Sequence, residues 1–126
     1  MAKPVLLIVD DIFINRVLLG EIAREIGCEF KMAGNGKEAI GLLEQTHFDM
    51  VLMDIEMPVM NGLETTRYIR NLSDKTIAAI PIVALTAHNP NDFFDEFNSA
   101  GFDELLTKPY LISKIQSVVE KFCMKK

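Results

Sequence analysis

Three acidic residues in this sequence follow apolar runs of the kind that form buried strands. Asp10 and Asp11 come directly after VLLIV, and Asp54 ends the segment MVLMD. If these two segments are neighbouring strands, the three carboxylates converge, and like charges that close resist joint ionisation unless a cation joins them. An all-oxygen cluster without His or Cys suits a hard cation, Mg²⁺ or Mn²⁺, rather than Zn²⁺. Because Mg²⁺ keeps positions open for water and phosphate oxygens, the cluster favours phosphate chemistry.

Two further residues at the ends of apolar runs suit the same chemistry. Lys108 supplies a point charge for a phosphoryl oxygen, and Thr86 supplies a hydroxyl donor. A carboxylate can itself be the nucleophile and form an aspartyl-phosphate, and Asp54, on the middle predicted strand, is the best candidate. A lone Asp at a strand end is more often a solvated terminus or a helix cap. The combination of four such strand ends is far more specific than any one of them.

The positions of these residues depend on a regular alternation of strands and helices. Apolar runs predict strands at 5–10, 29–33, 50–54, 82–86 and 104–107, and helical spacing of apolar residues predicts helices at 14–26, 36–46, 62–72, 91–100 and 110–123. This alternation indicates an α/β fold, a parallel sheet with helices on both faces joined by right-handed crossovers. In such sheets ligands bind outside the carboxyl ends of the strands, where the strand order reverses.

Two of the predicted helices begin with residues that suit a capping box. Asn35 precedes Glu38 by three residues, and Asn61 precedes Glu64 by the same spacing. In this arrangement the Asn side chain accepts from a backbone N–H of the first turn, while the acid reaches back to the cap.

Length and composition are those of one domain, which we expect to span residues 1–126. The net charge is −5 and the basic residues are scattered, so no direct contact with nucleic acid is expected. No apolar run is long enough to insert into a membrane, and the first one is too short for a signal peptide, so the default location is cytoplasmic. Cys28 and Cys123 have no metal-binding spacing and are expected to be reduced.

With these residues in place, the sequence strongly resembles the receiver domain of two-component response regulators. The motifs VDD, DMVLMDIEMPVMNGLE, IVALTA and LLTKPY carry the resemblance, which runs from about residue 4 to about residue 123. The text around Asp54 looks most like receivers attached to hybrid sensor histidine kinases. The resemblance implies a flavodoxin-like (βα)5 doubly wound sandwich with strand order 2-1-3-4-5.

The resemblance also implies roles for the acidic residues. Asp54 would accept a phosphoryl group from a phosphohistidine on a partner, either a sensor histidine kinase or a histidine phosphotransfer protein. Asp11 and Asp54 would bind Mg²⁺ or Mn²⁺ through their side chains, and Glu56 through its backbone carbonyl. Asp10 would act on the metal through water.

Further roles follow for the residues at the ends of the fourth and fifth predicted strands. Lys108 would contact the phosphate, together with the backbone N–H of Ala87, and Thr86 would turn inward when the phosphate arrives. The Lys108–Pro109 bond is cis in this family. Receivers usually place Tyr or Phe where this sequence has Leu105, so an aromatic rotamer switch cannot operate there together with Thr86.

Two surface features allow a bland and a functional interpretation. Phe93, Phe94 and Phe97 are expected to be core residues of the helix 91–100, although a partly exposed Phe94 would suit a partner surface. His88 is an ordinary loop residue unless it tunes, with Glu56, the access of water to an acyl-phosphate.

Three functions remain in competition. The first is a regulatory phosphoacceptor switch, whose catalysis is limited to phosphorylating and dephosphorylating itself, and which could form a phosphorylation-dependent dimer. The second is a Mg²⁺-dependent phosphohydrolase with an aspartate nucleophile. The third is a phosphorylation-independent interaction module, which the full set of acids and Lys108 disfavours.

Overall fold

Five short strands form the centre of the molecule. The computed structural model describes residues 3–55, 57, 60–87 and 100–123. The strands are β1 (Val5–Val9), β2 (Glu29–Ala33), β3 (Met50–Asp54), β4 (Ile82–Thr86) and β5 (Glu104–Thr107). All pairs are parallel, in the order β2-β1-β3-β4-β5. The predicted fold class and strand order are therefore confirmed.

The burial of each strand follows from its place in the sheet. Every residue of β3 and β4 is buried, because helices cover both faces of these inner strands. By contrast, polar and apolar residues alternate at the start of the edge strand β2, and its Glu29 and Lys31 are exposed. The continuously apolar runs of the sequence thus mark the inner strands.

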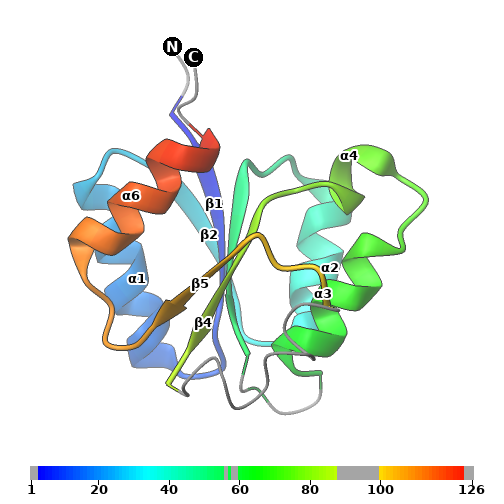
Figure 1. The fold of residues 1–126 in the computed structure, drawn as a ribbon, viewed down its shortest axis with the longest axis horizontal. Coiled ribbons are helices and arrows are strands. Elements are labelled where there is room, and N and C mark those ends of the chain that lie inside the picture. Colours follow the sequence, from blue (N-terminus) through cyan, green and yellow to red (C-terminus); the bar gives the residue numbers. More distant parts are fainter. Residues whose placement is uncertain (1–2, 56, 58–59, 88–99, 124–126) are drawn as a thin grey trace.

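Helices lie on both faces of the sheet. They are α1 (Phe13–Glu25), α2 (Gly36–Gln45), α3 (Gly62–Arg70), α4 (Lys75–Ala78) and α6 (Ile112–Cys123). Figure 1 shows α1 and α6 on one face and α2, α3 and α4 on the other. The predicted helix 91–100 lies almost wholly outside the described residues, as do Glu56, His88, Phe93, Phe94 and Phe97.

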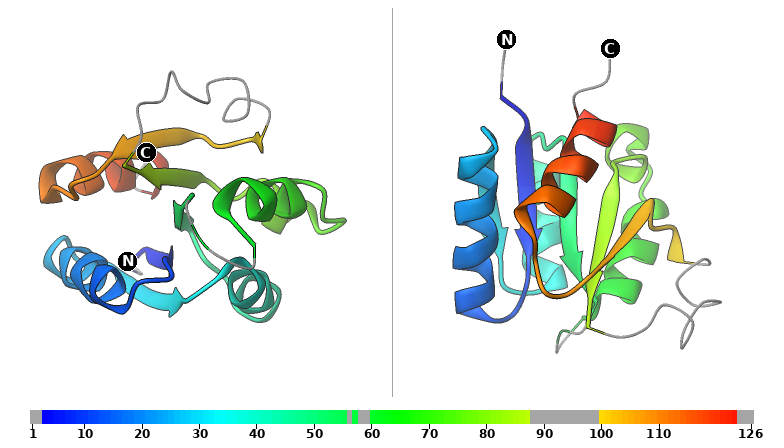
Figure 2. Two further views of the ribbon diagram at one scale, coloured as in Figure 1. Left: turned by 90° about the horizontal axis from the view of Figure 1, so that it is seen from below. Right: turned by 60° about the vertical axis from the view of Figure 1, so that its left-hand side comes forward.

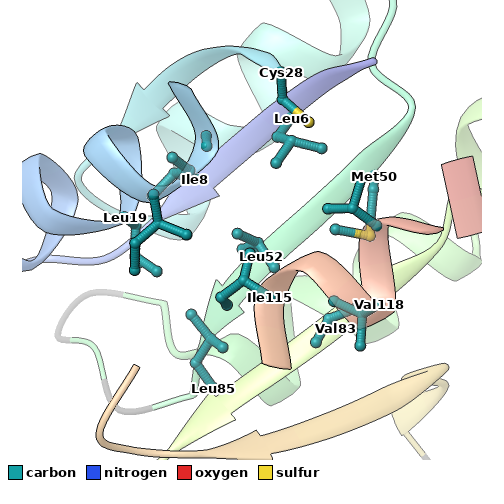
Figure 3. Packing of buried hydrophobic residues seen from close by; sticks show 13 residues of the cluster. Leu6, Ile8, Leu19, Cys28, Met50, Leu52, Val83, Leu85, Ile115 and Val118 are labelled. Carbon is teal, nitrogen blue, oxygen red and sulfur yellow. The ribbon is translucent and has the colours of Figure 1, made fainter. Parts of the chain in front are cut away.

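Two hydrophobic clusters hold the helices to the sheet. The first joins α1 and α6 to the sheet, and Figure 3 shows Leu19 of α1 and Ile115 of α6 meeting strand residues such as Leu52. The second lies on the opposite face, where Leu43 of α2 and Ile69 of α3 are buried. The carboxyl ends of the strands are therefore fixed by packing on both sides.

One described helix was not predicted, and the predicted helices 14–26, 36–46, 62–72 and 110–123 keep their bounds to within two residues. The unpredicted helix is α4, which follows α3 from Lys75. Asp74 caps α4 by accepting from the backbone N–H groups of Thr76 and Ile77. A helix of one turn carries too little periodicity to be predicted from apolar spacing.

The two predicted capping boxes turn out differently. Asn61 and Glu64 form a complete box at the start of α3, because each side chain accepts from the backbone N–H of the other. At α2, Asn35 accepts from the N–H of Glu38, but the Glu38 carboxylate accepts instead from Gly34, one residue before the cap. Only the box that starts α3 closes as predicted.

The first and last described elements meet at the amino edge of the sheet. Asp49 accepts from the backbone N–H of Val5 through Oδ2, at 2.8 Å, and donates its own N–H to the Val5 carbonyl, also at 2.8 Å. The Sγ of Cys123, the last residue of α6, lies 3.9 Å from the Asp49 carbonyl. Figure 1 shows the start of β1 and the end of α6 on this side.

Candidate functional site: an acidic pocket at the carboxyl edge of the sheet

The three aspartates predicted to converge do so. Because β1 and β3 are paired in parallel, with Val9 opposite Met53, the residues at their carboxyl ends become neighbours. One carboxylate oxygen each from Asp10, Asp11 and Asp54 lies within 4.8 Å of the other two. Figure 2, left, looks onto this edge of the sheet.

The two adjacent acids have very different surroundings. Asp10 is fully buried, and its Oδ1 accepts from the Ile12 backbone N–H at 3.0 Å and, at 3.5 Å, from the Asn15 amide. Its Oδ2 accepts from the Tyr110 hydroxyl at 3.0 Å. Asp11 is partly exposed, yet its Oδ1 is buried and has no hydrogen-bond partner. Asp10 is therefore held by the protein, whereas Asp11 keeps an oxygen for something else.

That unpartnered oxygen provides a test of whether the pocket fits a cation. A buried carboxylate oxygen without a donor is costly, and so is a cluster of three like charges. One divalent cation on Asp11 and Asp54 would relieve both costs, and carboxylate oxygens are the ligands that Mg²⁺ prefers. The residues present therefore fit the cation that the sequence predicted.

Lys108 is the cation that the chain itself places in this pocket. Its Nζ lies 3.4 Å from Oδ1 of Asp54, whose side chain is 2% exposed. The backbone N–H of Lys108 donates to the Thr86 carbonyl at 2.8 Å, which fixes the end of β5 beside that of β4. The Lys108–Pro109 peptide bond is cis, as expected.

Two of the predicted phosphate contacts, Thr86 and Ala87, lie at the carboxyl end of β4, the strand next to β3. Thr86 is fully buried at the end of β4, which pairs with β3 so that Leu85 lies opposite Asp54. Ala87 follows it and is exposed. Leu105 is partly buried on β5, opposite Ala84. The strand order thus brings Asp54, Thr86 and Lys108 to one edge, while Glu56 lies outside the described residues.

The backbone behind Asp54 leaves no room for a side chain on α3. A Cβ on Gly62 would lie 2.5 Å from the Asp54 carbonyl oxygen and 2.7 Å from the Ile55 Cα. The Gly62 N–H donates to the Ile55 carbonyl at 2.9 Å. The first turn of α3 is therefore packed directly on the segment that presents Asp54.

The sequence did not single out Tyr110. It belongs to the motif LLTKPY, but no rule of spacing connects a tyrosine in that place with an acid 100 positions earlier. Burial raises the pKa of the Tyr110 phenol above its ordinary value, and the charge of Asp10 and their hydrogen bond raise it further. Tyr110 therefore stays a proton donor to Asp10 at neutral pH.

Exposed apolar side chains follow the acidic pair at the start of α1. Ile12 and Phe13 follow the acidic pair directly, and Phe13 is 67% exposed. Ile14 and Leu18 continue this strip along α1 and are exposed as well. We call Ile12, Phe13, Ile14 and Leu18 the α1 strip. Apolar side chains gathered beside a polar pocket are typical of a protein-binding surface.

Comparison with known proteins agrees with this geometry. The sequence profile of the family described as the response regulator receiver domain matches residues 6–120. The chain belongs to this family. Receiver domains are regulatory domains of two-component phosphorelay systems. The resemblance inferred from the four motifs is thereby confirmed.

The relatives include hybrid sensor kinases. The receiver domain is 34% identical over 117 residues to the autoinducer 1 sensor kinase/phosphatase LuxN of Vibrio campbellii, and the match covers 93% of this chain but 13% of that protein. The chain therefore spans only a small part of the length of such relatives.

Two solved structures are informative. A receiver domain of a Pseudomonas aeruginosa sensor histidine kinase, with magnesium coordinated in its active-site cleft, matches with a TM-score of 0.89 and 27% identity over 98% of this chain and 100% of that one. The Saccharomyces cerevisiae receiver domain of Ssk1, crystallised with the histidine phosphotransfer protein Ypd1, matches with a TM-score of 0.85 and 30% identity over 97% and 90%.

Among the described residues, no helix is both long and apolar enough to cross a membrane.

Proposed function

We propose that this receiver domain is a phosphoacceptor switch in which Asp54 takes a phosphoryl group from a phosphohistidine on a partner. One observation carries the proposal. Asp54 is buried at the end of β3, beside the Nζ of Lys108. The neighbouring strand β1 leads to Asp11, one of whose carboxylate oxygens is buried without a hydrogen-bond partner. This arrangement provides a nucleophile, a cation and an open ligand position for one phosphoryl group.

The transfer step requires little from the protein beyond position and charge. An Asp54 carboxylate oxygen attacks phosphorus, a P–O bond forms, and the P–N bond to the donor imidazole breaks, with its electron pair going to nitrogen. A bound Mg²⁺ would offset the negative charge that gathers on the phosphoryl oxygens. Asp11 and Asp54 would hold it through their side chains, Glu56 through its carbonyl and Asp10 through water.

The residues at the ends of β4 and β5 would hold the transferred group. The ammonium of Lys108 moves from Asp54 to a phosphoryl oxygen, and the Thr86 hydroxyl and the Ala87 N–H donate to the others. These contacts exist only in the phosphorylated state. They therefore shift the population of conformations at this edge of the sheet, which is how a phosphoryl group changes a partner surface.

The partner in this proposal is a sensor histidine kinase or a histidine phosphotransfer protein. The Ssk1 receiver was crystallised with such a phosphotransfer protein. In the present chain the α1 strip lies next to the acids and offers apolar contact area for the partner that carries the phosphohistidine.

The proposal treats residues 1–126 as one domain and places it in the cytoplasm. In that compartment free thiols such as those of Cys28 and Cys123 stay reduced.

Intact mass spectrometry tests the proposal directly. Incubation with Mg²⁺ and a small acyl-phosphate donor should add one phosphoryl group to the protein, and Asp54→Asn should abolish the adduct. A matched control is Asp74→Asn, because Asn caps a helix as well as Asp does and α4 lies away from the pocket.

If Asp54→Asn gains as much phosphoryl adduct as the wild type, Asp54 is not the phosphoacceptor. Rapid turnover of several small phosphomonoesters, without a stable adduct, would instead support the phosphohydrolase. Unchanged partner binding after phosphorylation would support the phosphorylation-independent module.

A further inference from the structure

Tyr110 joins two parts of the pocket that come from opposite ends of the chain. Its hydroxyl lies 3.0 Å from Oδ2 of Asp10, at the end of β1. The Nζ of Lys108, at the end of β5, lies 5.8 Å from the centroid of its ring. The ring itself packs against the first hydrophobic cluster, between the sheet and the helices α1 and α6. The Tyr110 ring is therefore anchored in the core, and Tyr110 contacts both the carboxylate of Asp10 and the ammonium group of Lys108.

Asp10 depends on this hydroxyl. Its side chain has no exposed surface, so each carboxylate oxygen needs a donor from the protein or from a bound cation with its waters. Ile12 and Asn15 serve Oδ1, and among the hydrogen bonds between described residues Tyr110 serves Oδ2. Without the hydroxyl, Oδ2 of a buried carboxylate would lose its donor, and the protein would orient Asp10 through Oδ1 alone.

We propose that Tyr110 is a positioning residue for the cation site, whose hydroxyl fixes the orientation of Asp10 so that Asp11 and Asp54 remain the acids that bind the cation directly. The proposal rests on the Mg²⁺ site of the proposed function. Residues that hydrogen-bond to the ligands of a metal, or to groups that hold its waters, orient the site and commonly change metal affinity when they are removed. Tyr110 would act in this way on Asp10.

The chain offers an unusually clean spectroscopic test. It contains two tyrosines and no tryptophan, and the second tyrosine, Tyr68, is half exposed on α3. In the variant Tyr68→Phe, all tyrosine emission comes from Tyr110, and phenol emission is sensitive to a hydrogen bond with a carboxylate. Titration with Mg²⁺ should change this emission with the same dissociation constant that calorimetry gives. Binding seen by calorimetry without any change in Tyr110 emission would count against the proposal.

Removal of the hydroxyl provides the second test. Tyr110→Phe keeps the ring in the core and removes the donor, and we expect the dissociation constant for Mg²⁺ to rise roughly 10-fold. Tyr68→Phe is the matched control, since it removes a hydroxyl from an exposed tyrosine and should leave Mg²⁺ affinity unchanged. A purely structural role of Tyr110 would lower the urea midpoint of the metal-free protein but would not change Mg²⁺ affinity.

A double-mutant cycle identifies Asp10 as the residue through which Tyr110 acts. In an Asp10→Asn background, Tyr110→Phe should no longer change Mg²⁺ affinity, because the carboxylate that it orients is gone. An equal loss in both backgrounds, or an unchanged affinity in Tyr110→Phe alone, would overturn the positioning role. If the wild-type protein accepts phosphate with Mg²⁺ while Tyr110→Phe binds Mg²⁺ normally, only this inference fails. If the wild type neither binds Mg²⁺ nor forms an adduct, both proposals fail.

Discussion

Neighbouring residues of the same type do different work in this pocket. Asp10 and Asp11 are both acids, but Asp10 is surrounded by donors and Asp11 keeps an unpartnered oxygen. The backbone of Asp10 still takes part in the sheet, since its N–H donates to the Ala33 carbonyl of β2. The Asp10 side chain is fully buried. The family resemblance implies different roles for the two acids, and their burial and hydrogen bonds show a physical difference that the residue types alone do not reveal.

The thiol of Cys123 provides a prediction about pH. Burial, the charge of Asp49 and the nearby Cys28 raise the pKa of Cys123 from 9.0 to about 12. Below pH 9 the thiol is protonated in the folded and unfolded states, so its contribution to stability is fully present. Between pH 9 and 12 only the unfolded state loses the proton, and stability falls as pH rises. Urea midpoints measured from pH 8 to pH 11 should fall less steeply for Cys123→Ala than for the wild type.

Alkylation supplies the control for this prediction. Thiolates are the reactive form, so iodoacetamide at pH 8.5 should modify Cys123 far more slowly in the folded protein than in urea. Rapid modification of Cys123 in the folded protein would contradict the raised pKa.

Among the elements, α3 is positioned by its first turn, which packs on the backbone that carries Asp54. Gly62→Ala would place a Cβ 2.5 Å from the Asp54 carbonyl oxygen, and backbone atoms cannot move aside as a flexible side chain can. We expect a loss of about 2 kcal/mol in the free energy of unfolding. The proposed acyl-phosphate reaction should also slow, because the displaced backbone carries Asp54, the proposed nucleophile.

Gly41→Ala is the matched control for this substitution. Gly41 lies inside α2 and a Cβ there would have nothing within 4 Å. Alanine favours the helix over glycine, so this variant should gain about 0.5–1 kcal/mol. Equal effects of the two substitutions, measured by urea unfolding, would refute the steric explanation.

Arg70 connects three segments of the chain at the end of α3. Its guanidinium donates to the carbonyls of Ala78, Ile80 and Gly101, at 2.7–2.9 Å, and to Oδ2 of Asp103, at 2.8 Å. Arg70→Met would leave these acceptors without their charged donor. We expect the free energy of unfolding to fall by about 3 kcal/mol, as judged from urea midpoints.

An exposed arginine shows what a simple surface ion pair contributes. Arg24 pairs with Glu21 on the surface of α1, with both side chains about two-thirds exposed. Arg24→Met should therefore cost less than about 1 kcal/mol. If Arg70→Met costs no more than Arg24→Met, Arg70 does not hold these segments together.

The sequence predicted most elements, and its errors have physical causes. Apolar runs located all five strands, and those of the inner strands β3 and β4 are continuous because these strands are buried on both faces. The apolar spacing that predicts α1 includes Ile14 and Leu18, which are exposed, since a pattern records apolarity and not what covers it. The donor from Tyr110 to Asp10 joins residues far apart in sequence, so no local pattern could predict it.

The molecule as a whole should respond to the cation as a folded protein responds to any ligand that binds only the native state. Three carboxylates converge only when β1 and β3 are paired, so the unfolded chain has no such site. At a Mg²⁺ concentration 100 times the dissociation constant, we expect about 2.7 kcal/mol of added stability, and a chelator should remove it. Thermal unfolding with and without Mg²⁺ measures this difference.

Asp11→Asn provides the control for the linkage. The variant keeps the shape of the side chain but removes a charge from a proposed ligand of the cation, so most of the Mg²⁺-dependent stabilisation should disappear. An equal rise in melting temperature for the wild type and Asp11→Asn would mean that Mg²⁺ stabilises the protein at some other place.

The ends of the described chain, gathered around Asp49, lie at the edge of the sheet opposite the acids. Anchoring the protein to a sensor chip by either end would therefore leave the pocket facing the flowing solution. A short peptide that joins the two ends would have only a small gap to bridge, because both β1 and α6 contact the same residue. A circularly permuted version, opened in the exposed turn between α3 and α4, should keep the sheet and its acidic edge intact.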